Sequence, residues 1–148
     1  MIAVIQRVIN ANVKINNLEQ RTINHGLVIL LGINKEDTEK DTTYLTDKII
    51  GLRIFNDRNN KMNNSLLDVN GSVLIISQFT LCGDIHKGRR PSFLNAANPK
   101  KGMGLYIDFV ELFKQKGVKV KTGEFGSHMD VTILNNGPVT FVIDSNNK

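Results

Sequence analysis

The sequence predicts an α/β protein of the α+β type, with a largely antiparallel sheet or open β-barrel and two main helices packed on it. Three observations support this prediction. Segments with strand-like patterns outnumber the helical ones, short turn signals separate them, and only two stretches repeat their apolar residues at helical spacing. Helices laid against such a sheet are the usual way for both elements to bury their apolar faces.

The first part of the chain is predicted to form three strands. Residues 3–8 and 12–15 alternate apolar and polar side chains, as strands with one buried face do. Residues 27–31 form a short apolar run closed by Gly32, which is typical of a buried strand.

Two segments have the spacing of α-helices. The first begins at a capping box formed by Thr38 and Asp41 and ends near Gly51, and the second ends at Gly117. The apolar residues that define them are Tyr44, Leu45, Ile49 and Leu52 in the first, and Leu105, Phe109, Leu112 and Phe113 in the second.

The remaining pattern is strand-like. An Asn70-Gly71 pair is a turn signal between two such segments. The further strands are expected at residues 52–55, 72–77, 118–121, 130–134 and 139–143.

Composition favours one cytoplasmic domain over residues 1–148. A domain of this size buries roughly 68–70% of its unfolded surface. The chain has 41% hydrophobic residues, a single cysteine, and neither a secretory signal pattern nor an apolar run long enough to span a membrane. Its formal net charge of +5 favours a polyanionic partner, although charge alone leaves the nature of that partner open.

No familiar catalytic set is visible. His25, His86 and His128 fall in different predicted loops and belong to no hydrolase or zinc-protease motif, so surface or packing roles are favoured for them. The chain has no phosphate-binding glycine loop, and with only Cys82 it has no cysteine-based zinc cluster. We therefore expect no cofactor and no metal.

Two segments break local rules. Ser77-Gln78-Phe79-Thr80-Leu81 continues an apolar strand with polar side chains, and Asn135-Asn136-Gly137-Pro138-Val139-Thr140 places a proline where a strand begins. Taken singly, each has an ordinary explanation. The first could bond neighbouring backbone and the second could be a plain turn.

Together, the two segments resemble the S-Q-F-T-L and N-x-G-P-V-T signatures of the D-aminoacyl-tRNA deacylase family. The resemblance extends in order through residues 3–8, 52–55, 87–93 and 122–126, and so covers nearly the whole chain. The sequence departs from the family pattern at Cys82-Gly83 and matches it weakly over residues 95–104. The first departure argues against a catalytic role for Cys82.

The resemblance implies a homodimer that hydrolyses D-aminoacyl-tRNA and glycyl-tRNA. In this family a cis Gly137-Pro138 bond of one subunit would enter the active site of the other, with its carbonyls excluding an L side chain. Arg7 would hold this loop. A wall made of backbone discriminates by handedness and ignores side-chain identity.

The resemblance also implies the remaining site residues. The backbone around Ser77, Gln78, Phe79 and Thr80 would hold the ester carbonyl and the terminal ribose, whose neighbouring hydroxyl could assist attack. Two groups of residues would then bind the nucleic acid: Phe125 and Met129 would pack on the terminal adenine, and Lys87, Arg89 and Arg90 would contact phosphates. Core packing remains an alternative for Phe125 and Met129, and solvated surface charge for the three cations.

Two other interpretations remain open. One is a non-catalytic nucleic-acid-binding protein that uses its positive surface, for example in the control of DNA replication. The other is a conventional esterase with Cys82 or Thr80 as nucleophile. The absence of a candidate base near Thr80 in the sequence disfavours the latter.

Overall fold

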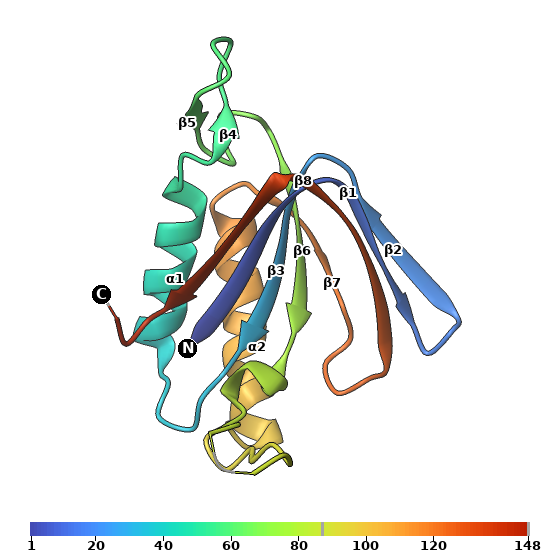
Figure 1. Cartoon of the computed structure of the whole chain (residues 1–148), viewed down its shortest axis with the longest axis vertical. Coiled ribbons are helices and arrows are strands. Elements are labelled where there is room, and N and C mark those ends of the chain that lie inside the picture. Colours follow the sequence, from blue (N-terminus) through green and yellow to red (C-terminus); the bar gives the residue numbers. More distant parts are fainter. Residues whose placement is uncertain (87, 148) are drawn as a thin grey trace.

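The computed structural model describes residues 1–86 and 88–147 as a strongly curved, barrel-like sheet with two α-helices on one side (Figure 1). The strands of the curved sheet are β1 (Ile2–Ile15), β2 (Glu19–Ile23), β3 (Gly26–Gly32), β6 (Ser72–Ser77), β7 (Lys119–Thr122) and β8 (Met129–Asp144). The helices are α1 (Glu39–Gly51) and α2 (Pro99–Gln115), with a short 3-10 turn, η1 (Phe79–Cys82), after β6. Strands β4 (Phe55–Asn56) and β5 (Met62–Asn64) form a separate hairpin.

The two longest strands give the sheet its curvature. The first half of β1 lies between β3 and β8, and its second half lies between β2 and β8. The pairing of β1 with β8 shifts register between Gln6 and Val8 and again between Val8 and Asn10. Irregularities of this kind bend and twist a strand, so β2 is carried round toward β7 and the sheet nearly closes.

The sheet is mixed. Strand β1 pairs antiparallel with β2, β3 and β8, whereas β3 with β6 and β6 with β7 pair in parallel. Both parallel pairings require long crossovers, and α1 and α2 lie within these crossovers. The helices therefore cover the same stretch of sheet.

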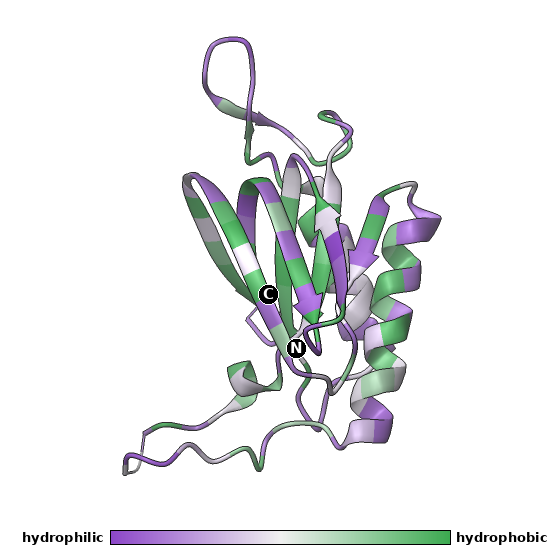
Figure 2. Cartoon of the chain, turned by 90° about the vertical axis from the view of Figure 1, so that its right-hand side faces the viewer, coloured by the Kyte–Doolittle hydropathy of each residue, from purple (hydrophilic) through white to green (hydrophobic). Residues whose placement is uncertain are grey.

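Apolar side chains fill both sides of the central strands. On β3, Leu27, Ile29 and Leu31 face the helices, where they pack with Phe109 and Phe113 of α2. Val28 belongs to a second cluster inside the curve of the sheet. Burial on both faces explains why residues 27–31 are uninterruptedly apolar, and Figure 2 shows the contrast with the hydrophilic β4–β5 hairpin.

The predicted fold class is confirmed, with three corrections to predicted elements and two short strands, β2 and β5, that were not predicted. Residues 3–8 and 12–15 belong to one strand, as do 130–134 and 139–143, because bulges bend these strands without interrupting them. Of the strand predicted at 52–55, only the last residue is in a strand. Arg53 lies before the hairpin and donates through Nε to the Asn63 carbonyl at 2.6 Å.

The helix predictions are confirmed. Thr38 and Asp41 form the expected capping box: the Thr38 amide donates to the Asp41 carboxylate at 2.9 Å. Partial burial acts to raise the pKa of Asp41, but hydrogen bonds with Thr38 and Ser145 outweigh it, and the pKa is lowered. At the end of α2, Gly117 has a φ of +80° and its amide donates to the Lys114 carbonyl at 2.9 Å.

Candidate active site

A cleft of about 230 Å³ opens at the end of β6, between η1 and the loop that joins β7 to β8. Its lining residues are Ile76, Ser77, Gln78, Phe79, Gly126, Ser127, His128, Met129 and Val131. The polar ending of a core strand, noted in the sequence, therefore forms one wall of a cleft.

The first wall is the segment Ser77 to Phe79, and Thr80 follows it in η1 without lining the cleft. Ser77 lies opposite Leu31 in the parallel pairing, and the Gln78 amide donates to the Leu31 carbonyl at 2.8 Å, which fixes the point where the strand becomes a turn. The Gln78 side-chain amide donates to Thr80 Oγ1 at 2.6 Å. Thr80 itself is exposed, and its hydroxyl accepts this bond at the edge of the cleft wall.

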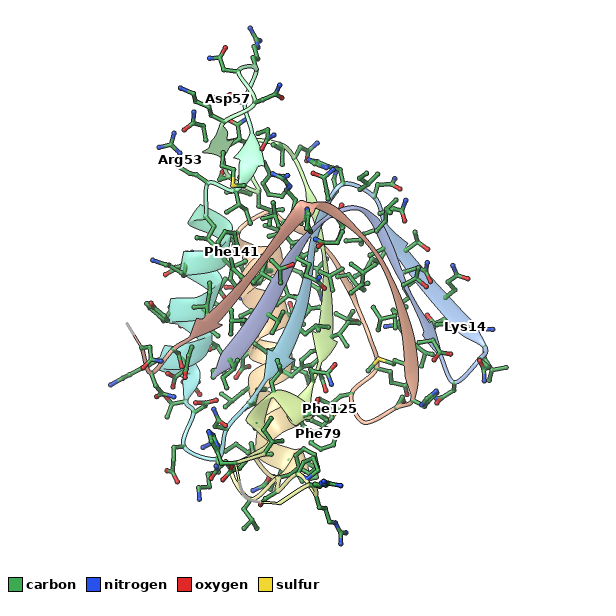
Figure 3. All side chains as sticks on the ribbon, in the orientation of Figure 1. Lys14, Arg53, Asp57, Phe79, Phe125 and Phe141 are labelled. Carbon is green, nitrogen blue, oxygen red and sulfur yellow. The ribbon has the colours of Figure 1, made fainter. Side chains whose placement is uncertain are left out.

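The second wall comes from the start of β8. Met129 is half-buried and lines the cleft, and its contact with a substrate base stays a prediction. Phe125 lies at the same end of the barrel as Phe79 (Figure 3), but its ring packs on α2, with its centroid 5.9 Å from that of Tyr106. The core-packing alternative accounts for this contact of Phe125.

Arg21 of β2 fastens the second wall to the barrel. Its Nη1 donates to the Thr122 carbonyl at 2.9 Å and to Thr122 Oγ1 at 3.1 Å, and its Nε and Nη2 bond both carboxylate oxygens of Glu19. The hydrogen bond to Glu19 raises the pKa of Arg21 and lowers that of Glu19. Sequence patterns did not single out Arg21, because its partners on β7 are 101 residues away.

The Gly137-Pro138 segment lies at the bend of β8. Its peptide bond is cis, both residues are exposed, and Gly137 has a φ of +119°. A Cβ at Gly137 would lie 2.8 Å from Val139 Cγ2 and 3.0 Å from Arg7 Nη2, so this position admits only glycine without displacement of a neighbour.

Arg7 holds the segment from the inside. It is 5% exposed and donates through Nη1 to the Ile54 carbonyl at 2.7 Å and to Asn56 Oδ1 at 3.0 Å, and through Nε to the Asn136 carbonyl at 3.4 Å. The predicted contact between Arg7 and this loop is therefore present. Its additional bonds to the residues around β4 were not predicted.

Within one chain, the Gly137-Pro138 segment and the cleft lie apart. The segment lies beside Arg7, which pairs with Leu27, whereas Ser77 pairs with Leu31. Four residues along β3 and three strand spacings across the sheet put the two places on the order of 20 Å apart.

The predicted basic loop projects beyond the cleft. Amide–carbonyl bonds of 2.8 and 2.9 Å between Asp84 and Ser92 close its base, and Arg89 and Arg90 are exposed. Lys87 lies outside the described residues. The figures show this loop at the end of the molecule that carries Phe79 (Figures 1 and 3).

The chemistry of Cys82 disfavours a thiol nucleophile. Its side chain is 6% exposed, and burial raises the pKa of the thiol. Because the thiolate is the nucleophilic form, this environment opposes catalysis by Cys82.

Outside the cleft, the described residues form another hollow, and they hold neither a cluster of metal ligands nor a helix that could span a membrane. A shallow hollow of about 530 Å³ lies between the start of α1 and α2, and none of the predicted site residues lines it. In residues 1–86 and 88–147 no group of three or more His, Cys, Asp or Glu side chains could hold a metal ion. No helix there is long and apolar enough to cross a membrane.

Five residues that line the cleft were missed by the sequence reasoning: Ile76, Gly126, Ser127, His128 and Val131. Gly126, Ser127 and His128 lie between the predicted Phe125 and Met129, and their closeness in sequence to those two residues was the available signal. His128 is exposed, with Nε2 3.6 Å from Asp130. A pattern search for histidine motifs does not find it, since no motif contains it.

The chain is thus a small α/β protein with a barrel-like sheet, two helices and a cleft at the end of the sheet that shows no catalytic triad among the described residues. Solved structures share this fold. One, described as a c-Myc DNA unwinding element binding protein, is 39% identical with a TM-score of 0.90 over 97% of this chain and 98% of that chain. Another, described as a probable eukaryotic D-amino acid tRNA deacylase, has a TM-score of 0.81 over 96% of this chain and 98% of that chain, but at 18% identity it supports only the fold.

Sequence comparison identifies the family. The model of the D-Tyr-tRNA(Tyr) deacylase family matches residues 4–144, and the chain belongs to this family. A D-aminoacyl-tRNA deacylase of Thermosipho africanus is 54% identical over 98% of this chain and 97% of that protein. A Bacillus subtilis protein named an inactive D-aminoacyl-tRNA deacylase is 54% identical over 83% of this chain and 93% of that protein.

Proposed function

We propose that this chain hydrolyses the ester between a D-amino acid, or glycine, and the 3′-terminal adenosine of tRNA, and that it rejects L-aminoacyl-tRNA. The chain is a hydrolase of aminoacyl-tRNA esters by its membership of the family. The observation that carries the proposal is the pair of half-sites: a cleft beside Ser77–Thr80, and an exposed glycine–proline segment held by Arg7 at the other end of the sheet.

In the proposed mechanism the cleft binds the ester and the terminal adenosine. The first amides of a helical turn have no acceptor within the turn, so those of Phe79 and Thr80 can stabilise the charge that develops on the ester carbonyl. Ser77 and Gln78 orient the ribose, whose neighbouring hydroxyl assists a water. The base packs against Met129, with Phe125 behind this wall. An activated ester needs little more than such placement.

The chiral filter is proposed to come from a second copy of the chain. The separation of about 20 Å, estimated along the sheet from strand register, supports a filter supplied in trans. On a homodimer, the Gly137-Pro138 carbonyls of the partner would face the α-carbon of the substrate and leave no room for an L side chain. Three apolar side chains on β8 are exposed and could be buried in an interface with a second copy: Leu134 is 49% exposed, Phe141 41% and Val142 68%.

One assay tests the activity. The pure protein is incubated with D- and L-aminoacyl-tRNA carrying the same amino acid, and ester loss is followed. We expect cleavage of the D form and of glycyl-tRNA, with the L form spared. Equal rates for both enantiomers, or none for either, would contradict the proposal.

A mixing experiment tests the shared site. Thr80→Ala removes the hydroxyl that orients the Gln78 side chain of the cleft, and Gly137→Ala displaces the carbonyls that would hold the α-carbon of the D-residue, because the added Cβ meets Val139 and Arg7. Each variant alone should lose most D-ester cleavage. Random re-pairing gives half heterodimers, each with one intact site, so mixing should restore about a quarter of the wild-type rate. No recovery, with dimers confirmed by sedimentation, would refute the shared site.

The exposed cations provide a further test. If Arg89 and Arg90 contact phosphates, replacing both by alanine should weaken binding to all tRNAs alike and flatten the dependence on salt. Unchanged binding across salt concentrations would place this loop outside the interface.

A non-catalytic nucleic-acid-binding role is the second candidate. It is favoured by the similarity to the 39% identical protein, which is described as binding a DNA unwinding element. That role predicts nucleic-acid binding that tolerates Thr80→Ala and no ester cleavage by the wild type. The enantiomer assay separates the two functions.

A further inference from the structure

An exposed pair of aromatic rings adjoins the cleft. Phe79, which lines the cleft, is 57% exposed, and Phe93 is 39% exposed. Their ring centroids are 4.9 Å apart with 64° between the ring planes. Large apolar side chains that gather on a surface beside a cleft mark a place where a ligand or partner binds.

The local backbone holds Phe93 in place. The Asp84 amide donates to the Ser92 carbonyl at 2.8 Å and the Ser92 amide to the Asp84 carbonyl at 2.9 Å, so the residue before Phe93 is fixed. A Cβ at Gly83 would lie 2.9 Å from Phe93 Cε1, which shows that the ring rests closely on this glycine. The pair is therefore a preformed surface, and little ordering is needed when a ligand binds.

Positive charge accompanies the rings. Arg89 and Arg90 are exposed on the loop that the Asp84–Ser92 pairing closes, and no acidic partner is recorded for either among the described residues. Flat apolar rings beside cations match the chemistry of unpaired nucleic acid, whose bases stack on aromatic side chains while its phosphates attract Lys and Arg. A partner made of protein would gain less from two clustered arginines.

The size of the cleft limits what it can enclose. Its volume of about 230 Å³ is below the range of roughly 300–1,000 Å³ that is usual for sites enclosing a drug-sized ligand. Once a terminal adenosine and its aminoacyl group are bound, the nucleotide before it must lie outside, at the rim. Phe79 lies at that rim, and its ring is in contact with the ring of Phe93.

We propose that Phe93, together with the ring of Phe79, forms a stacking surface for the unpaired nucleotide that precedes the terminal adenosine of the tRNA substrate. This inference rests on the proposed function and adds a second nucleotide subsite to it. Stacking tolerates any base, because every base has a flat face. The subsite would contribute affinity for the 3′ strand and leave the choice between D- and L-amino acids to the cleft.

Two substrates separate this proposal from the proposed function itself. D-aminoacyl-tRNA carries the preceding nucleotide, and 2′(3′)-O-D-aminoacyl-adenosine lacks it. If the proposed function fails, the wild type cleaves neither. If the function holds and the subsite exists, Phe93→Leu should raise KM for the tRNA substrate roughly 5- to 150-fold, the range of one base–aromatic stack, and leave kcat/KM for the adenosine ester unchanged.

Matched variants isolate the flat ring. Phe93→Tyr keeps the stacking face and should retain wild-type KM for the tRNA substrate. Leu94→Ala, at a neighbouring side chain that is 84% exposed, removes apolar area from the same loop and should also have no effect. An equal effect of Phe93→Leu on both substrates, or an equal effect of Leu94→Ala, would overturn the proposal.

A spectroscopic readout reports the contact directly. An RNA hairpin with the 3′ end of tRNA and 2-aminopurine at the penultimate position should lose fluorescence when it binds the wild type, and should lose less with Phe93→Leu at saturation. Sedimentation of both proteins tests the other occupant, a second copy of the chain. If Phe93→Leu converts the protein to a smaller species, the aromatic pair is a subunit contact and the subsite is refuted.

Discussion

Replacing Arg7 by methionine should weaken both the fold and the rejection of L-aminoacyl-tRNA. Methionine keeps most of the packed stem but removes the guanidinium that joins three parts of the chain: the Ile54 carbonyl, Asn56 and the Asn136 carbonyl. The last of these immediately precedes Gly137. The substitution therefore tests whether the same side chain supports both the stability of the fold and the selectivity of the site.

The magnitude follows from the contacts. A hydrogen bond from a charged donor contributes roughly 1.5–3 kcal/mol, and Arg7 makes two at 3.0 Å or less. Removal of a charge that is only 5% exposed also relieves the cost of its burial, which offsets part of the loss. We expect a net loss of about 2–3 kcal/mol in the free energy of unfolding, or roughly 5–10 °C in Tm for a chain of this size.

Two measurements test this prediction together. Urea unfolding gives the stability, and ester loss from D- and L-aminoacyl-tRNA gives the selectivity. Arg7→Lys is the control: an ammonium can bond one carbonyl but cannot provide the guanidinium fork, so it should recover part of the stability and less of the selectivity. Full rejection of the L substrate by a destabilised Arg7→Met protein would show that Arg7 has no part in the filter.

Three further predictions follow. Arg21→Met should raise KM for D-aminoacyl-tRNA roughly tenfold, the equivalent of one charged hydrogen bond. The control Arg53→Met, just before the distant β4–β5 hairpin, should leave KM unchanged. Asp37→Asn should lower the free energy of unfolding by about 3 kcal/mol in urea, because Asp37 and the Met1 ammonium form a buried pair at 2.6 Å. Cys82 should react with iodoacetamide only at pH values above those for an unperturbed thiol near 8.5, since burial raises its pKa, and Cys82→Ala should retain activity.

Local patterns predicted the elements whose causes are local. The capping box that begins α1 and the glycine that ends α2 act within a few residues, and both are present. The buried strand at 27–31 also followed from composition, because a run of apolar residues has to be covered on both faces. The strand predicted at 52–55 failed because these residues leave α1 and enter a hairpin whose position depends on Arg7, far away in the sequence.

The arrangement of the site depended on register, which no local pattern contains. The two signature segments are both recognisable in the sequence, but the pairing of β1 with β8 and of β3 with β6 determines that they lie at different levels of the sheet. The clamp from Arg21 to Thr122 depends on the same closure of the barrel. Such contacts join residues from 46 to 142 positions apart, so they follow from the tertiary fold alone.

The proposed filter explains why so few side chains in this site have an obvious chemical role. A wall of side chains would recognise one amino acid, whereas carbonyl oxygens at Gly137 and Pro138 would sense only the direction of the bonds at the α-carbon. Such a wall needs residues that keep side chains out of the way and a fixed backbone, which the close contacts at Gly137 and the hydrogen bonds of Arg7 provide. Selectivity for handedness and indifference to side chain would then have one physical origin, and a variant that gains L substrates should gain them regardless of their side chains.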